Sequence, residues 1–354
     1  MEPLQSLLKE RPNITGKREN PVREYRYNCV NKSLLEPLVK KYYVSLYFQW
    51  IPRKLTANWI TLVSCAAMWG MLYLVFHPHK FSVAVLAIVF AFLIHFYMVG
   101  DILDGMQAKV TGTCSPLGEF MDHYFDVYNG AIALAACFAL IPIEPAVFYP
   151  LLWLSYLAFA ATMMEERERG QLYFGPIGSL EGIFFLLIFY LSCLFPAGQA
   201  FWRTPLWNGI PGYWILILLG GMGYLLTVLD IFKRLGYSPP QFTNFVFGSF
   251  LLSIALAENT LPRSAGWFIL AFYCGDYIGK VMDSYFRHGK HPYPDFFSTA
   301  GIVFLFADGY VHLLTGDGNL KLMAALGIYM GLKCLWNLGK TLAGLRRHWL
   351  WVNP

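Results

Sequence analysis

Ten apolar segments recur along this chain of 354 residues, and polar or charged stretches separate them. A helix needs about 20 consecutive, mostly apolar residues to cross the hydrocarbon of a bilayer. Segments near that length lie at residues 58–76, 82–100, 122–143, 147–164, 180–197, 212–232, 242–257, 265–285, 295–315 and 320–340. The pattern predicts an all-α fold, a polytopic membrane helix bundle with about ten transmembrane helices.

The composition agrees with a membrane setting. Hydrophobic residues make up 56% of the chain and charged residues only 14%, an apolar share that a soluble domain does not need. Trp59, Tyr97 and Trp214 lie near segment ends, where aromatic side chains favour the membrane interface. The seven cysteines form no CxxC pair, so we interpret them as packing residues rather than as a zinc site or a disulfide framework.

The chain before the first span divides into two parts. Residues 1–33 are polar and contain no apolar core of a cleavable signal peptide. Residues 34–50 (LLEPLVKKYYVSLYFQW) mix leucines, aromatic residues and lysines, which predicts an interfacial amphipathic helix within 34–54. The alternative is a short linker that docks on the bundle.

The distribution of Lys and Arg predicts the orientation. If the basic N-terminal end is cytoplasmic, the same side receives Arg167, Arg169, Lys233, Arg234, Arg287, Lys290, Arg346 and Arg347. By the positive-inside rule, both termini and the loop at 101–121 then lie in the cytoplasm. We interpret the net charge of +5 as an orientation signal and a contact with anionic lipids. No nucleic-acid partner is indicated.

Four aspartates lie between two apolar segments, in the run GDILDGMQAKVTGTCSPLGEFMDHYFD. Asp101 and Asp104 are three residues apart, and Asp122 and Asp126 are four apart, so each pair shares one face of a helix. Carboxylates at bilayer depth are costly and mark functional sites. If the two helices face each other, four oxygen ligands converge, which suits Mg²⁺ or Mn²⁺ better than zinc. Without a cation, four buried negative charges would repel one another.

The spacing D-x2-D-G-x2-A-K-x8-G-x3-D-x3-D resembles the signature of the CDP-alcohol phosphotransferase family, in which Arg is usual where this chain has Lys109. The stretch TGTCSPLGEFMDH looks most like the eukaryotic-type choline and ethanolamine phosphotransferases. NKSLLEPL and ANWITLVS resemble their N-terminal region. The resemblance is specific over about the first third of the chain. It implies transfer of phosphoethanolamine or phosphocholine from a CDP ester to diacylglycerol, with release of CMP.

The resemblance and the residue types together suggest individual roles. The metal ligands would be Asp101, Asp104, Asp122 and Asp126, and the substrate contacts Asn58, Gly105, Ala108, Lys109 and Gly118. Small residues let the nucleotide approach the backbone, and a lysine contacts phosphate as a point charge without the two-pronged geometry of Arg. For proton transfer we favour His123 with Glu119 orienting it. Asp126 is the alternative base, and a hydrogen bond from His123 to an aspartate ligand is the non-catalytic alternative.

The implied partners are a CDP-amino-alcohol donor from the cytoplasm, a diacylglycerol acceptor that arrives between helices, and membrane lipids; a homodimer is also an option. The location would be the endoplasmic reticulum or Golgi membrane if the chain is eukaryotic. The implied organisation is a polar cytoplasmic N-terminus at 1–33, the interfacial helix at 34–54, a catalytic bundle at 55–232, C-terminal transmembrane helices at 233–345 and a cytoplasmic tail at 346–354.

Two other functions fit parts of the sequence. One is the same fold acting on a different head group or lipid acceptor, as in a phosphatidylinositol-type synthase. The other is a membrane transporter with an acidic ion site, which would keep its acidic residues near the midplane on broken helices. Tyr124 stands where the resembling enzymes carry a small residue. Its bulk would favour ethanolamine, whereas its ring face would favour a quaternary ammonium.

Further polar residues have competing interpretations. Asn58 could contact the nucleotide or cap the first helix, and Glu181 suits the start of a helix. Asp276, Lys280 and Asp283 share a helical face and form either an ion-pair cluster or a second site. Asp308 and His312 are interpreted as polar contacts between helices.

Overall fold

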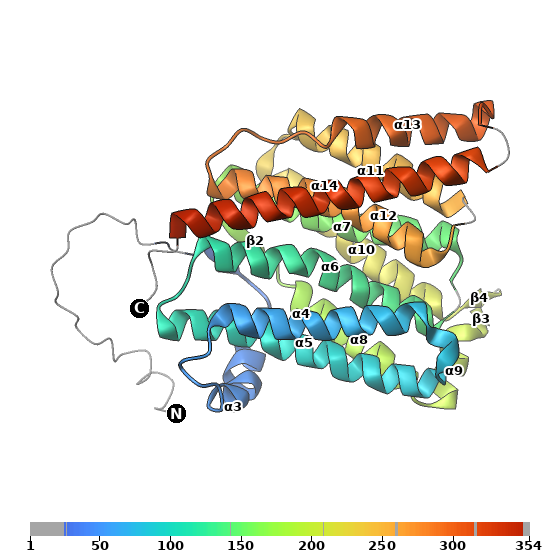
Figure 1. Ribbon diagram of the computed structural model, residues 1–354. Coiled ribbons are helices and arrows are strands. Elements are labelled where there is room, and N and C mark those ends of the chain that lie inside the picture. Colours follow the sequence, from blue (N-terminus) through green and yellow to red (C-terminus); the bar gives the residue numbers. More distant parts are fainter. Residues whose placement is uncertain are drawn as a thin grey trace.

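The computed structural model describes Tyr25 and residues 27–141, 143–207, 209–258, 261–314 and 317–349, with only the backbone at 207 and 347–349. Long helices lie side by side in one bundle (Figure 1). They are α4 (Ala57–Phe76), α5 (Val83–Thr111), α6 (Pro116–Leu140), α7 (Pro145–Arg169), α8 (Ser179–Ser192), α9 (Pro196–Arg203), α10 (Tyr213–Leu235), α11 (Pro240–Glu258), α12 (Arg263–Phe286), α13 (Phe296–Val311) and α14 (Gly318–Trp349). The predicted all-α membrane bundle is confirmed.

A helix occupies each of the ten predicted ranges. Within the described residues, six of these helices are long and apolar enough to cross a membrane: α4, α5, α7, α10, α11 and α14. The bent pair α8 and α9 raises that number to seven. The helices α6, α12 and α13 pack beside them. Of these, α6 carries three acidic residues of the aspartate run and α13 has only 16 residues.

The segment predicted as one span at 180–197 is sharply bent. Helix α8 ends at Ser192, and α9 leaves it at an angle of 113°. Pro196 starts α9 because its ring fits the first turn of a helix but not a helix interior. The bend is held by hydrogen bonds from Trp202 Nε1 to Ser192 Oγ (2.7 Å) and from Gln199 Nε2 to the carbonyl of Cys193 (2.8 Å).

A short helical stretch precedes the first span. It comprises α2 (Glu36–Leu38), a π-helical turn at Val39–Val44 and α3 (Ser45–Phe48), so it is shorter than the predicted 34–54. Val39 and Val44 pack against α5, whereas the opposite surface exposes Leu34, Leu38, Tyr42, Tyr43, Leu46, Tyr47 and Trp50. The stretch is therefore both docked on the bundle and amphipathic. Its place at a membrane surface stays a prediction.

The chain before this stretch is tied to the α7–α8 connection. Strand β1 (Cys29–Asn31) pairs in parallel with β2 (Leu172–Phe174), and Cys29 lies opposite Leu172. Glu181, at the third position of α8, accepts hydrogen bonds from the Gly178 amide (2.7 Å), Ser33 Oγ (2.6 Å) and the Leu35 amide (3.0 Å). The interpretation of Glu181 as a helix-start residue is confirmed. At the other end of the bundle, β3 (Pro205–Trp207) pairs with β4 (Ile210–Pro211) (Figure 1).

Helix α6 lies at the centre of the molecule. It contacts α4, α5, α7, α8, α12 and α14, and nearly every residue between Val127 and Leu140 is buried. Its run of alanines allows neighbouring helices to approach closely. On the α12 side, Gly275 and Gly279 lack side chains where the rings of Tyr128 and Tyr124 lie. The position of α6, and of the acidic residues at its start, therefore depends on packing against the C-terminal helices.

We predict that Gly275→Ala lowers the thermal midpoint of the protein in detergent, followed by intrinsic fluorescence. The new methyl group would overlap the hydroxyl group and ring of Tyr128, and overpacking typically costs about 1–3 kcal/mol. The matched control is Gly223→Ala in α10, where a Cβ meets nothing within 4 Å. This control should be neutral or slightly stabilising. Equal midpoints for the two variants would contradict the packing argument.

Candidate active site

A tight turn brings the two aspartate-bearing helices together. Helix α5 ends at Thr111, and its cap residue Gly112 has a left-handed conformation (φ 67°) that suits a residue without a side chain. Helix α6 begins at Pro116, four residues after Gly112, and Ser115 Oγ accepts a hydrogen bond from the Gly118 amide (3.1 Å). The C-terminal end of α5 and the N-terminal end of α6 therefore meet at one end of the bundle (Figure 1).

A cavity of about 360 Å³ opens at this end. Its walls come from the N-terminal segment, α4, α5, α6 and the start of α8. The cavity is lined by every site residue predicted from the sequence: Asn58, Asp101, Asp104, Gly105, Ala108, Lys109, Gly118, Glu119, Asp122, His123 and Asp126. The structure thus gathers the predicted residues in one place. Their individual roles stay predictions.

Three of the four aspartates form a compact group. One carboxylate oxygen from each of Asp101, Asp122 and Asp126 lies within 4.8 Å of the others. Carboxylate oxygens are the ligands that Mg²⁺ and Mn²⁺ prefer. Like charges this close repel strongly unless a cation or shared protons lie among them. The donor set therefore fits a hard divalent cation.

Asp104 lies outside this compact group, although it lines the same cavity. Its Oδ2 accepts a hydrogen bond of 2.5 Å from Thr61 Oγ1 on α4. Helices α4 and α5 approach closely enough for this hydrogen bond because residue 100 is a glycine. A side chain on Gly100 would collide with Ser64. Asp126 has a comparable support, since Tyr97 Oη donates a 2.5 Å hydrogen bond to its Oδ1. Such contacts orient a carboxylate for metal binding.

The small residues of the motif leave room at the cavity wall. A Cβ added to Gly105 would meet nothing within 4 Å, so the backbone there is open to a ligand. At Gly118 the added atom would lie 3.2 Å from Oδ1 of Asn58.

Helix α4 starts at Ala57 after the cap residue Thr56. The idea that Asn58 caps this helix is therefore wrong, and its side chain is available to the cavity.

His123 contacts two residues at the cavity. Its Nε2 lies 3.5 Å from Tyr27 Oη, and its Nδ1 lies 3.9 Å from Oδ2 of Asp122. In the part of the chain that the structure describes, no hydrogen bond or ion pair joins Glu119 to His123. Instead the carboxyl group of Glu119 lies close to that of Glu166 on α7. The predicted orientation of His123 by Glu119 thus has no contact to support it.

The sequence did not point to several residues that the structure places at the site. They are Tyr27, Lys40, Thr61, Tyr97 and Glu166. Burial, and next the charge of Lys109, lower the pKa of Lys40, so two lysines share the cavity wall. One signal lies in the N-terminal segment, where residues 25, 27, 29, 31 and 33 all line the cavity. In an extended chain every second side chain points to the same side.

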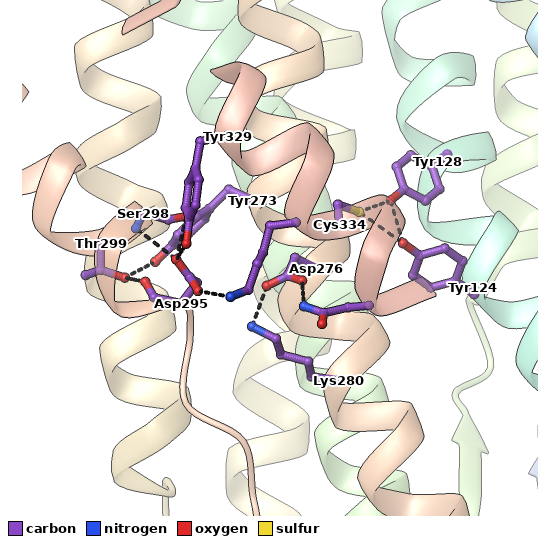
Figure 2. Close-up of polar contacts among 12 residues, drawn as sticks. Tyr124, Tyr128, Tyr273, Asp276, Lys280, Asp295, Ser298, Thr299, Tyr329 and Cys334 are labelled. Carbon is purple, nitrogen blue, oxygen red and sulfur yellow. Dashed lines mark hydrogen bonds and ion pairs between the residues drawn. The ribbon is translucent and has the colours of Figure 1, made fainter. Parts of the chain in front are cut away.

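Tyr124 points away from the cavity. Its hydroxyl group lies 2.9 Å from Tyr128 Oη and 3.3 Å from Cys334 Sγ on α14, as Figure 2 shows. Consecutive helical residues point in directions about 100° apart, so a residue near the aspartates in sequence can lie on another face of the helix. The suggestion that Tyr124 shapes a head-group pocket is wrong.

Asp276 and Lys280 of α12 belong to a separate cluster between α12, α14 and the start of α13 (Figure 2). Asp276 pairs with Lys280 (2.5 Å) and accepts a hydrogen bond from Asn337 (2.6 Å). Asp295, the cap of α13, pairs with Lys333 at 3.1 Å. The ion-pair interpretation is confirmed for Asp276 and Lys280.

The other predicted polar contacts have different outcomes. Asp283 pairs with Arg287 at 2.8 Å and so belongs to a separate ion pair. Asp308 accepts a hydrogen bond from the Leu314 amide (2.8 Å) and another from Asn319 (3.3 Å). Asp308 therefore closes the end of α13 and also joins it to α14, which confirms the interpretation as a polar contact between helices for this residue. His312 is the left-handed residue that follows this helix.

Comparison with known proteins finds a family match for one part of the chain. Residues 54–220 match the family described as CDP-alcohol phosphatidyltransferase, and this range contains the whole aspartate motif. This part of the chain is a CDP-alcohol phosphatidyltransferase domain. The family resemblance of the motif is thereby confirmed.

Several curated relatives of the CDP-alcohol phosphatidyltransferase domain are known. Cholinephosphotransferase 1 of Mus musculus is 31% identical over 192 residues, which cover 51% of this chain and 46% of that protein. Cholinephosphotransferase 1 of Homo sapiens is 29% identical, covering 51% and 45%. A CDP-diacylglycerol–serine O-phosphatidyltransferase of Encephalitozoon cuniculi is 29% identical, covering 51% and 48%. The chain thus spans about half the length of the curated relatives it matches.

We predict that Tyr97→Phe weakens Mn²⁺ binding, measured by electron paramagnetic resonance on the protein in nanodiscs. The substitution removes the hydroxyl group that holds Asp126, and loss of such a support typically lowers metal affinity 10- to 100-fold. Tyr73→Phe on the exposed surface of α4 is the matched control and should bind as the wild type does. Unchanged affinity in Tyr97→Phe would show that Asp126 does not hold the ion.

Proposed function

We propose that this protein transfers phosphoethanolamine or phosphocholine from its CDP ester to the hydroxyl group of diacylglycerol. The products are phosphatidylethanolamine or phosphatidylcholine, and CMP. The observation that carries this proposal is the single cavity in which three clustered carboxylates, His123 and two lysines meet within a CDP-alcohol phosphatidyltransferase domain. A pyrophosphate ester and a proton acceptor could be bound together there.

The donor's pyrophosphate would lie against the cations and small residues of the wall. Lys109 follows Gly105, where the backbone is open, and Ala108, which also lines the cavity. Lys40 faces the same cavity from the N-terminal helical stretch. Two lysines near one another repel, and an anion bound between them relieves that repulsion. In the family motif one arginine contacts phosphate through two groups at once. Here Lys109 and Lys40 together would provide part of that contact. Asn58 and Gly118 would border the nucleotide.

The carboxylates would hold the divalent cation. Asp101, Asp122 and Asp126 are the direct ligands in this proposal, and Asp104, fixed by Thr61, completes the set. When bound, Mg²⁺ or Mn²⁺ neutralises phosphate oxygens and stabilises the charge that develops on the leaving group. Tyr97 keeps Asp126 turned toward the cluster.

His123 would accept the proton in the transfer step. The hydroxyl oxygen of diacylglycerol forms a bond to the phosphorus that carries the amino-alcohol, and the bond from that phosphorus to the bridging oxygen breaks. CMP leaves with that oxygen and its electron pair, and the hydroxyl proton passes to the imidazole. Asp126 suits this task less well, because Tyr97 and the carboxylate cluster already engage it.

The membrane context completes the proposal. The basic loops would place the cavity at the cytoplasmic face, where a water-soluble CDP ester reaches it. Diacylglycerol would arrive from the bilayer between helices, and the exposed apolar surface at residues 34–50 would rest on the same leaflet. An endoplasmic reticulum or Golgi membrane suits this reaction in a eukaryotic cell.

One related reaction also has support. The similarity to a CDP-diacylglycerol–serine O-phosphatidyltransferase favours, as the second candidate, a reaction in which the CDP ester carries the lipid and a small alcohol is the acceptor. The two reactions share the cavity chemistry and differ in which substrate bears the nucleotide.

The deciding experiment measures CMP release by purified protein in nanodiscs with Mg²⁺ or Mn²⁺. CDP-ethanolamine and CDP-choline are each supplied with diacylglycerol, and CDP-diacylglycerol is supplied with serine in a parallel reaction. We expect CMP only in the diacylglycerol reactions, and none after chelation of the metal. Release only with CDP-diacylglycerol would establish the second candidate, and no release in any reaction would reject both.

In the same assay, Asp122→Asn should reduce the rate at least ~1,000-fold, because the amide removes the negative charge of a central ligand. Asp230→Asn is the control, since this aspartate lies on α10 and pairs with Arg234. Near-normal turnover by Asp122→Asn would refute the metal assignment.

We also predict that Lys40→Gln raises the KM for the CDP ester roughly tenfold, with a smaller effect on kcat. The substitution removes one cation from the cavity wall, and a charge-assisted contact is worth about 1.5–3 kcal/mol. Lys41→Gln is a matched control, because the neighbouring Lys41 is exposed and lies over the ring of Tyr42. The same change of KM in both variants would argue for a general surface effect.

A further inference from the structure

Two carboxyl groups beside the cavity have no cationic partner within the described residues. Glu119 lines the cavity, and its carboxyl group lies close to that of Glu166 on α7. Both residues are buried, with exposed fractions of 8% and 3%. Oε2 of Glu119 also lacks a hydrogen-bond partner. A buried carboxylate normally has a cation or hydrogen-bond donors beside it, so this wall of the cavity is incomplete by itself.

The neighbouring Glu165 on α7 is a buried carboxylate that has its partners within the protein. It is 1% exposed, and its oxygens accept hydrogen bonds from Nε and Nη2 of Arg234, each at 2.7 Å. A second guanidinium, that of Arg169, lies 3.5 Å away. Glu119 and Glu166 differ, because either a shared proton or a cation from the cavity has to relieve their repulsion.

Helix α6 aligns Glu119 with the aspartate cluster. Glu119 lies three residues before Asp122 and seven before Asp126, so the three side chains share one helical face. One helical turn rises about 5.4 Å, and the two carbon atoms between phosphate and nitrogen in an amino-alcohol head group span a similar length. The nitrogen of such a head group can therefore reach Glu119 while its phosphate lies at the aspartates.

We propose that Glu119 and Glu166 bind the ammonium group of the substrate, and that they favour a primary ammonium over a quaternary one. This inference rests on the proposed function, in which the CDP ester carries an amino-alcohol. A primary ammonium has three N–H donors, one of which satisfies Oε2 of Glu119. The nitrogen of choline has none, so choline would supply charge and leave that oxygen unpaired.

An aromatic binding site for choline has less support at this wall. Quaternary ammonium groups bind to the faces of aromatic rings. Tyr27 lines the same cavity, but the ammonium group of Lys109 lies over its ring, 6.0 Å from the centre. Choline at this ring would therefore meet a like charge, whereas a primary ammonium at Glu119 meets an opposite one.

The first test measures donor binding without turnover, by titration calorimetry of the protein in nanodiscs with Mg²⁺ and without diacylglycerol. The ligands are CDP-ethanolamine, its N-methyl and N,N-dimethyl derivatives, and CDP-choline, which lose the N–H donors one at a time. We expect the affinity to fall at least about tenfold along the series, because a buried oxygen becomes unpaired. The largest step should come at CDP-choline. Equal affinities along the series would overturn the proposal.

The second test uses Glu166→Gln, which keeps the size of the side chain and removes its charge. The dissociation constant of CDP-ethanolamine should rise about tenfold, and that of CDP-choline should change less. Glu168→Gln is the matched control on the same helix, since Glu168 pairs with Arg167 and accepts a hydrogen bond from Tyr237; it should keep the wild-type preference. If Glu166→Gln weakens CDP, which has no head group, by the same factor, the proposal is overturned.

CMP release separates this inference from the proposed function. If both donors yield CMP with diacylglycerol but bind equally, the function stands and the ammonium site fails. If the affinities fall along the series but no donor yields CMP, the proposed function fails and the ammonium site stands. The amino group of serine has the same chemistry. If CMP comes only from CDP-diacylglycerol with serine, a higher KM for serine in Glu166→Gln would support the site, and an unchanged KM would overturn it.

Discussion

The mutual repulsion of carboxylates at one end of a membrane bundle is the constraint on which this structure depends. Asp101, Asp122 and Asp126 approach within 4.8 Å, in surroundings where charge is poorly solvated. The protein holds them there with a turn capped by Gly112 and Ser115, and with the hydrogen bond from the Tyr97 hydroxyl group to Asp126. Such an arrangement needs a cation or shared protons among the carboxylates, and the oxygen donor set fits a divalent cation.

Helix α6 connects the carboxylates of the site to the packing of the rest of the bundle. One face presents Asp122 and Asp126 to the cavity, and another places Tyr124 and Tyr128 against Gly279 and Gly275 of α12. The C-terminal helices lie outside the matched domain, yet they determine how far and at what angle the acidic face projects. The polar cluster around Asp276 and Asp295 in turn joins α12 and α13 to α14. The geometry of the candidate site thus depends on packing on the opposite side of one helix.

The sequence predicted what local spacing determines. Hydropathy located every long helix, and the spacing of the aspartates placed two carboxylates on each helix face. The sequence did not predict contacts between distant residues, such as Thr61 with Asp104 or Tyr27 with His123. Such contacts leave no local pattern in the sequence. Tyr124 was misassigned because closeness in sequence does not specify the face of a helix. The bend after Ser192 was missed because the apolar residues continue past it, so hydropathy alone does not show that Pro196 starts a new helix.

The pairing of β1 with β2 has a consequence for the order of synthesis. Asn28 and Gln171, which join these strands through a side-chain hydrogen bond, are 143 residues apart. During translation the N-terminal strand must wait until α4, α5, α6 and α7 have emerged before its partner exists. The helices that carry the aspartates can assemble earlier, but the wall that carries Tyr27 closes only afterwards. A nascent chain that ends before residue 172 would therefore hold the carboxylate cluster without the tyrosine beside its histidine.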